Sequence, residues 1–145
     1  MEGLGEMQSA LENTVEVAAM PEAATRGTVL LVEDDRAVRR YMEVLLQKEG
    51  FAVIPAADGL EAMKLSLSAR FDVVITDAIM PQLNGYELCR FFRRHPRFMQ
   101  VPVVLLSGME QNGAFKDETA MPDAFLSKPV NPEQLSACLA KLVGK

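Results

Sequence analysis

The sequence contains few residues of the kinds that build covalent or metal cross-links. Among its 145 residues are two cysteines, Cys89 and Cys138, and they do not form the C-x-x-C spacing of zinc and redox sites. Both fall within helical apolar patterns, so we expect reduced side chains that pack as small hydrophobic residues. The single histidine, His95, stands among arginines in a loop-like stretch, which favours an ordinary surface residue.

A basic arm and long apolar runs are also missing. The formal charge is −5, and residues 1–27 contribute most of it, with five glutamates against one arginine. The nearly neutral remainder lacks the clustered Lys and Arg that nucleic-acid binding requires. The sequence shows neither an apolar run of membrane-spanning length nor the basic start of a secretory signal. We therefore expect a soluble cytoplasmic protein without direct nucleic-acid or membrane binding.

The length and the 49% hydrophobic content suit one domain with a core of its own. Residues 1–27 are interpreted as an acidic tail or linker. Their apolar residues recur at intervals that permit a short helix, although such an isolated helix is marginal in water. Residues 28–145 are the expected domain.

Apolar runs and helical patterns alternate along this domain. Five runs predict strands, at Thr28–Val32, Phe51–Pro55, Phe71–Thr76, Pro102–Leu106 and Asp123–Ser127. Helical spacing predicts helices before Gly50, from Asp58 to about Ala69, from Tyr86 to Arg94, and from Asn131 to about Leu142. The helix expected between the fourth and fifth strands has few apolar anchors, and Gly113 and Pro122 weaken it further.

This alternation predicts an α/β fold, a doubly wound five-stranded parallel sheet in the flavodoxin-like order 2-1-3-4-5 with helices on both faces. The first and third strands are then neighbours at the switch point, where such folds bind ligands beside the carboxyl ends of the strands. Five polar residues should meet there: Glu33 and Asp34 after the first strand, Asp77 at the third, Ser107 at the fourth and Lys128 after the fifth.

Three carboxylates at one edge repel one another, so the arrangement favours a cation site over simple packing. Oxygen ligands without nearby His or Cys select a hard ion, and Mg²⁺ is the expected one. A carboxylate beside Mg²⁺ is a competent nucleophile for phosphoryl transfer. Asp77 is therefore the predicted phosphate acceptor, with Lys128 and Ser107 as donors to the phosphoryl oxygens.

Other phosphate chemistries fit the sequence less well. The P-loop pattern G-x-x-x-x-G-K-[ST] does not occur, and Glu33–Asp35 stands where a dinucleotide site needs a glycine-rich turn. A phosphatase with an aspartate nucleophile would place a second carboxyl group at the position of Ile79. Turnover of an external phosphoester is not expected.

These residues resemble the receiver domain of bacterial two-component response regulators, and they are similar to its single-domain, chemotaxis-Y-like class. The resemblance covers about Thr28 to Leu142. Its motifs are Leu31–Asp35, Ile75–Asp77 with Met80–Pro81 and Asn84–Gly85, Leu105–Gly108, and Phe125–Pro129.

The resemblance implies a role for each acidic residue. Asp77 would be the phosphorylated aspartate, Asp34 a direct Mg²⁺ ligand and Glu33 an acidic neighbour that holds the metal through water. The backbone carbonyl of Ile79 would be a further metal ligand.

The resemblance also implies a switch. Lys128 would contact the phosphoryl group, phosphorylation would draw Ser107 inward, and the aromatic Phe125 would follow and change a protein-binding face. Met121–Pro122 stands where the family usually has Gly-Ala, so we expect this face to be irregular.

The implied function is that of a phosphoacceptor module in a two-component phosphorelay. It would take its phosphoryl group from a sensor histidine kinase or a histidine phosphotransfer protein, and it would signal to a downstream protein or through a phosphorylation-dependent homodimer. Catalysis beyond its own phosphorylation and dephosphorylation is not expected. Two alternatives stay open: a phosphorylation-independent interaction module, and a receiver fragment of a hybrid histidine kinase.

Overall fold

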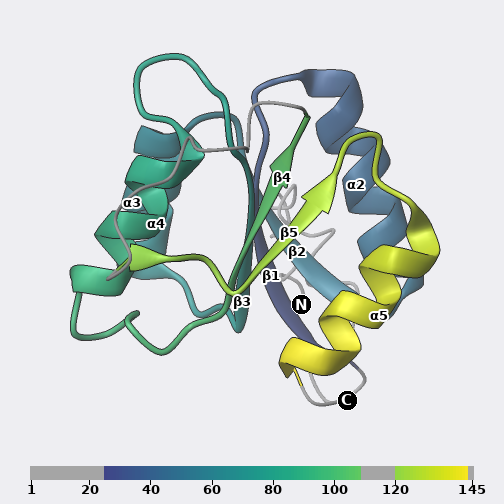
Figure 1. Cartoon of the computed structure of the whole chain (residues 1–145). Helices are drawn as coiled ribbons and strands as arrows, with labels where there is room; N and C mark the ends of the chain where they lie inside the picture. Colours follow the sequence, from purple (N-terminus) through teal and green to yellow (C-terminus); the bar gives the residue numbers. More distant parts are fainter. Residues whose placement is uncertain (1–24, 109–119, 144–145) are drawn as a thin grey trace, which may run out of the picture.

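The computed structural model describes residues 25–108 and 120–143, which form a central sheet with helices on both faces (Figure 1). Its five parallel strands have the order β2-β1-β3-β4-β5. The strands are β1 Gly27–Val32, β2 Phe51–Ala56, β3 Val73–Asp77, β4 Val103–Ser107 and β5 Ala124–Ser127. The predicted fold class and strand order are confirmed.

Four helices are described: α2 Arg36–Lys48, α3 Gly59–Ser68, α4 Gly85–Arg94 and α5 Pro132–Val143. In Figure 1, α3 and α4 cover one face of the sheet, and α2 and α5 cover the other. The helix expected between the fourth and fifth strands falls largely on residues 109–119, and the predicted tail falls largely on residues 1–24. Both lie outside the described residues.

The third strand begins two residues later than predicted, at Val73 instead of Phe71. The reason lies in what the two preceding residues contact. Phe71 packs its ring 5.4 Å from that of Phe98. Asp72 receives the Thr28 N–H on its carboxylate at 2.7 Å, as an anchor for the start of β1. Both residues therefore belong to the loop before β3, where their side chains contact other segments.

Alternate residues of β1 enter two separate cores. Val29 and Leu31 pack with residues of α2 and α5, whereas Leu30 and Val32 pack with residues of α3 and α4. Successive side chains of a strand point to opposite faces, so a strand buried on both faces has an unbroken apolar sequence. This burial explains the continuous apolar run that marks the strand in the sequence.

Four phenylalanines on the α4 side form one packed cluster: Phe71, Phe91, Phe92 and Phe98. His95 is half-buried and stacks on this cluster, with its ring centroid 4.6 Å from that of Phe98. His95 therefore keeps part of its surface open to solvent, as expected of a surface residue, while its ring contacts the aromatic cluster. Both cysteines are free, with Cys89 buried and Cys138 half-buried.

Capping side chains begin the helices immediately after the strand-to-helix loops. Asp35 accepts the Val38 N–H at the start of α2, and Asp58 accepts the Glu61 N–H at the start of α3. A capped start lets the chain turn sharply from strand to helix, so the polar residues after each strand stay at the sheet edge. Among the described residues, no helix is both long and apolar enough to cross a membrane.

Candidate functional site

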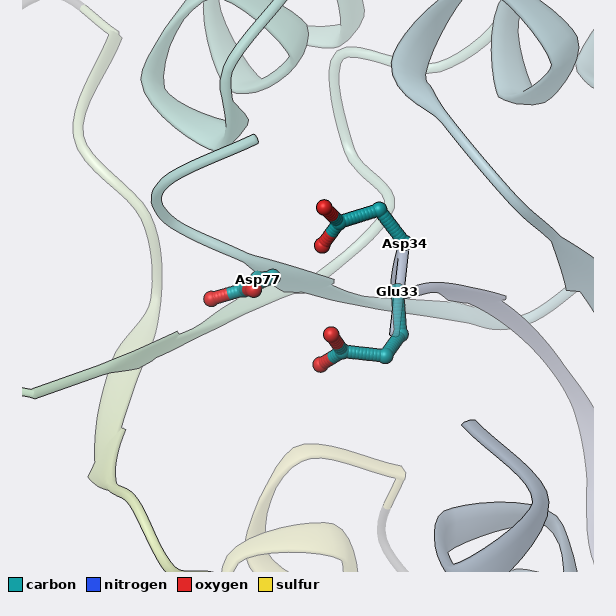
Figure 2. Close-up of side chains that lie close together, drawn as sticks. All are labelled: Glu33, Asp34 and Asp77. Atoms are coloured by element: carbon teal, nitrogen blue, oxygen red, sulfur yellow. The ribbon is translucent and has the colours of Figure 1, made fainter. Parts of the chain in front are cut away.

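Three carboxylates meet at the carboxyl ends of β1 and β3. These strands are neighbours, and their register pairs Val32 with Thr76. The next residue of each strand, Glu33 after Val32 and Asp77 after Thr76, therefore also lies beside the other. One carboxylate oxygen from each of Glu33, Asp34 and Asp77 lies within 4.8 Å of the other two. Figure 2 shows the carboxylates of the two consecutive residues both directed toward Asp77.

The three acids differ in exposure. Glu33 is fully buried and Asp77 is 5% exposed, whereas Asp34 lies open to solvent. Burial raises the pKa of Glu33 to about 7, and the negative charge of Asp77 raises it as well. The cluster is thus a recess of negative charge with an open side at Asp34, by which a cation can enter.

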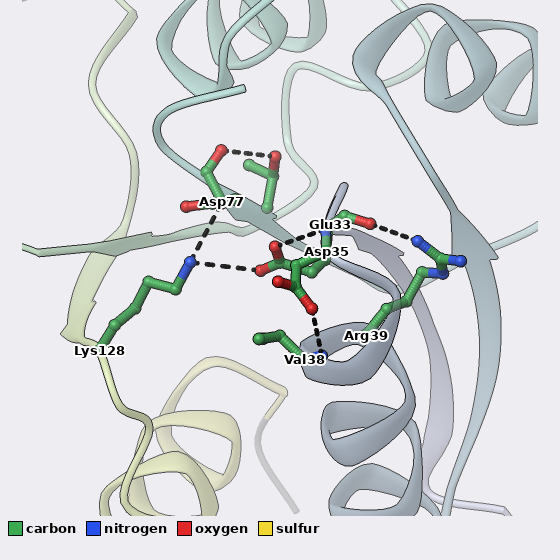
Figure 3. A network of polar contacts seen from close by, with 7 residues as sticks. Glu33, Asp35, Val38, Arg39, Asp77 and Lys128 are labelled. Atoms are coloured by element: carbon green, nitrogen blue, oxygen red, sulfur yellow. Dashed lines mark hydrogen bonds and ion pairs between the residues drawn. The ribbon is translucent and has the colours of Figure 1, made fainter. Parts of the chain in front are cut away.

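Lys128 lies on the other side of the Asp77 carboxylate. Its Nζ is 3.1 Å from Asp77 Oδ2 and 3.5 Å from Glu33 Oε1 (Figure 3). Its own N–H donates to the carbonyl of Ser107 at 2.9 Å, which ties the loop after β5 to the end of β4. Burial lowers the pKa of Lys128, but the hydrogen bond and charge of Asp77 outweigh that effect and leave the pKa raised. The lysine is therefore a fixed positive charge in this site.

The remaining predicted residues lie at the same edge or close to it. Ser107 is buried at the end of β4, where Leu106 pairs with Asp77. Phe125 of β5 pairs with Leu105 of β4, and it is 37% exposed. Ile79, two residues after the acceptor, exposes about half of its side chain, and the role of its carbonyl oxygen stays a prediction.

The structure adds one residue that the sequence interpretation missed, Arg39, and it gives a packing role to Gly85, which the sequence showed only as part of a motif. Arg39 of α2 donates from Nη1 to the backbone carbonyl of Glu33 at 2.8 Å. Gly85, the first residue of α4, lies so close to β3 that a Cβ atom there would be 2.3 Å from the carbonyl oxygen of Asp77. The Asn84–Gly85 pair belonged to the motifs of the resemblance, whereas nothing marked Arg39 among the arginines of its helix.

The donor set suits a hard divalent cation. All three candidate ligand groups are carboxylates, two of them on consecutive residues, and the described residues bring no His or Cys into the cluster. Mg²⁺ prefers such oxygen ligands and keeps several of its waters, so an open side is required. The residues therefore fit Mg²⁺.

Fold and site together define a class: flavodoxin-like α/β domains that carry an acidic cation site and a lysine at the switch point. Comparison with known protein families identifies one family for this class. The family model described as "response regulator receiver domain" matches residues 29–140, and the chain belongs to this family. The resemblance stated from the sequence is thereby confirmed.

Curated relatives agree with this assignment. The chain is 33% identical to protein PilG of Pseudomonas aeruginosa over 110 residues, which is 74% of this chain and 80% of the relative. It is 34% identical to the probable transcriptional regulator ycf29 of Porphyra purpurea over 119 residues, 79% of this chain and 56% of the relative. The chain thus spans about half the length of several curated relatives that it matches.

Solved structures show the same fold. The receiver domain of the sensor histidine kinase PA1611 of Pseudomonas aeruginosa, with a magnesium ion in its active-site cleft, has a TM-score of 0.75 at 28% identity, over 82% of this chain and 98% of that one. Chemotaxis protein CheY4 of Vibrio cholerae has a TM-score of 0.72 at 33% identity, over 79% and 97%. Receiver domains are signalling modules that interact with histidine kinases and downstream effectors, and the family binds Mg²⁺ at its acidic site.

Proposed function

We propose that this chain is a phosphoacceptor module that takes a phosphoryl group from a phosphohistidine onto Asp77. One observation carries the proposal. The Asp77 carboxylate is almost fully buried, yet it lies between an ammonium group 3.1 Å away and two further carboxylates. This combination positions a nucleophile, a cation site and a phosphate-binding lysine around one point, as phosphoryl transfer requires.

The proposed reaction is a single displacement. An oxygen of Asp77 forms a bond to phosphorus while the P–N bond of the phosphohistidine breaks, and the leaving imidazole keeps the electron pair and takes a proton from solvent. Lys128 now contacts the Asp77 carboxylate and would hold a phosphoryl oxygen after transfer. The Ser107 hydroxyl would donate to a second phosphoryl oxygen.

Mg²⁺ would be held by Asp34 and Asp77, by Glu33 through water and by the carbonyl of Ile79. When bound, it would neutralise charge on the phosphoryl oxygens. The chemistry of the three-carboxylate cluster supports this assignment, as does the magnesium ion in the PA1611 receiver domain.

The proposed output is a change of a protein-binding face. Phosphorylation would draw Ser107 toward the new phosphoryl group, and Phe125 would follow from its half-exposed position in β5. Such a switch responds only to the difference in interaction energy between its two states. The phosphodonor would be a sensor histidine kinase or a histidine phosphotransfer protein, and the reader a downstream protein or a second copy of the chain.

Phosphorylation can be tested with a small phosphodonor. We expect the chain to gain the mass of one phosphoryl group when it is incubated with acetyl phosphate and Mg²⁺, and Asp77→Asn to abolish the gain. Asp58→Asn is the matched control, because Asp58 caps α3 and asparagine caps equally well. Intact-protein mass spectrometry is the measurement. An unmodified wild-type chain under these conditions would favour a phosphorylation-independent interaction module.

A further inference from the structure

Arg39 connects helix α2 to the backbone of the acidic cluster. Its side chain is half-buried and turns back across the first turn of the helix, where Nη1 donates to the Glu33 carbonyl at 2.8 Å (Figure 3). Its own N–H donates to the Asp35 carbonyl at 2.8 Å, the hydrogen bond that begins the helix. Arg39 thus forms hydrogen bonds with both ends of the loop between β1 and α2: with Glu33 at its beginning and with Asp35 at its end.

This contact holds the peptide unit that joins two of the proposed metal ligands. The Glu33 N–H donates to the Ala56 carbonyl of β2 at 3.1 Å, and the Glu33 carbonyl accepts from Arg39. A peptide unit is planar, so a fixed carbonyl also fixes the direction in which the chain enters Asp34. The exposed Asp34 side chain has little packing of its own, and its direction depends on this backbone.

The Glu33 carboxylate is held separately. Its Oε2 accepts the Asp35 N–H at 3.1 Å, and its Oε1 lies 3.5 Å from Lys128 Nζ. The side chain of Glu33 is therefore fixed by the loop and the lysine, whereas the orientation of the following peptide depends on Arg39. Both sets of contacts are present in the structure in which Glu33 and Asp34 face Asp77.

We propose that Arg39 is a positioning residue of the Mg²⁺ site, which holds the Glu33–Asp34 peptide so that both carboxylates face Asp77. The inference rests on the proposed function, since it concerns the same site. It assigns a role in metal binding to a residue that touches neither the metal nor the phosphoryl group.

The direction in which Mg²⁺ affinity changes when the Arg39 guanidinium group is removed distinguishes a positioning role from an effect of its charge. A guanidinium group near three carboxylates opposes the binding of a divalent cation, so removal of its charge alone would strengthen Mg²⁺ binding. Loss of positioning would weaken it, because groups that orient metal ligands typically change metal affinity by about 10- to 100-fold. Weaker binding in a variant without the guanidinium group can therefore come only from lost positioning.

The test is an Mg²⁺ titration of the full chain and its variants, followed by calorimetry or amide NMR because the sequence has no tryptophan to report by fluorescence. Arg39→Met keeps an unbranched apolar stem and removes the donors, and we expect Mg²⁺ affinity to fall about 10-fold. Arg39→Lys restores a donor and a charge, so part of the affinity should return. Arg40→Met is the matched control: Arg40 is exposed and pairs with Glu43, and its loss should change the affinity less than about twofold.

Unchanged or tighter Mg²⁺ binding by a folded Arg39→Met chain overturns the inference, and so does equal weakening by Arg40→Met. If Arg39→Met does not fold, Arg39→Leu, which likewise has no donor, takes its place and is judged by the same criteria. A wild-type chain that fails to bind Mg²⁺ would overturn the metal-dependent function together with the inference. Normal wild-type binding and phosphorylation with an unaffected Arg39 variant would overturn the inference alone.

Discussion

At the scale of single residues, Glu33 joins the polar contacts of the site into one network. Its carboxylate contacts Lys128 and the Asp35 N–H, and its backbone carbonyl contacts Arg39 (Figure 3). A glutamate has one more methylene group than an aspartate, and here the side chain is fully buried beneath the lysine. A cation that enters the cluster therefore meets a ligand group that is already held in place.

Gly85 shows how close the packing around the acceptor is. Its N–H donates to the Ala78 carbonyl at 2.9 Å, and an added Cβ would lie 2.3 Å from the Asp77 carbonyl oxygen and 2.9 Å from Ala78 Cα. Only a residue without a side chain lets the start of α4 approach the backbone this closely.

We predict that Gly85→Ala lowers the free energy of unfolding by about 1–3 kcal/mol, because the added methyl group can be relieved only by a backbone shift. Gly59→Ala is the comparison, since its Cβ would lie 2.7 Å from Leu83 Cδ2 and 2.9 Å from the Leu83 carbonyl oxygen, a less severe approach than the 2.3 Å at Gly85. We expect a smaller loss there. Urea denaturation of both variants is the measurement, and a Gly85→Ala chain as stable as wild type would contradict the close packing.

At the scale of elements, α4 is hydrogen-bonded to the segments that lead into the N-terminal ends of β4 and β5. Arg93 donates to the carbonyls of Met121 at 3.1 Å and Val101 at 2.9 Å, and it forms an ion pair with Asp123. Asp123 also accepts the Val103 N–H at 2.8 Å. These contacts fix the chain where it enters β5, so the irregularity expected at Met121–Pro122 does not reach the regular pairing of β4 with β5.

We predict that Arg93→Ala lowers the free energy of unfolding by about 1.5–3 kcal/mol, since hydrogen bonds with a charged partner are lost and Asp123 keeps an unpaired charge. Arg40→Ala should cost less than about 1 kcal/mol, because its pair with Glu43 is exposed. Chemical denaturation is the measurement. In a double-mutant cycle with Asp123→Asn, strictly additive losses would show that the ion pair contributes nothing.

At the scale of the whole molecule, the fold concentrates negative charge at one edge of the sheet and offsets it with Lys128. The pKa of Glu33 rises from 4.5 to about 7 on folding. Between these pH values the folded chain binds more protons than the unfolded chain, so its stability falls as the pH rises. Mg²⁺ bound at the cluster would compete with that proton, so its stabilising effect would grow over the same range.

We therefore predict that the melting temperature of the metal-free chain declines as the pH rises from about 5 to about 7.5, and that Mg²⁺ raises it more at the upper end than at the lower end. Differential scanning calorimetry at several pH values, with Mg²⁺ or with a chelator, is the measurement. Glu33→Gln removes the titrating group and should flatten the profile. A wild-type profile equally flat in this range would contradict the raised pKa.

The sequence by itself determined the architecture and predicted which charged side chains meet at one edge of the sheet. Buried parallel strands have continuous apolar sequences, and right-handed crossovers leave few strand orders. Three acids and a lysine that follow different strands were therefore expected at one edge. Local patterns suffice for such conclusions because each depends on a few neighbouring residues and on general rules of chain topology.

Only the tertiary structure decided how these groups contact one another. The hydrogen bond between Lys128 and Asp77 joins residues 51 positions apart, and that between Lys128 and Glu33 joins residues 95 positions apart. The support of the Glu33 carbonyl by Arg39, the contact of Gly85 with the acceptor and the raised pKa of Glu33 also depend on packing and desolvation. These effects arise from distances of a few ångströms between separate elements, and no local sequence pattern specifies such distances.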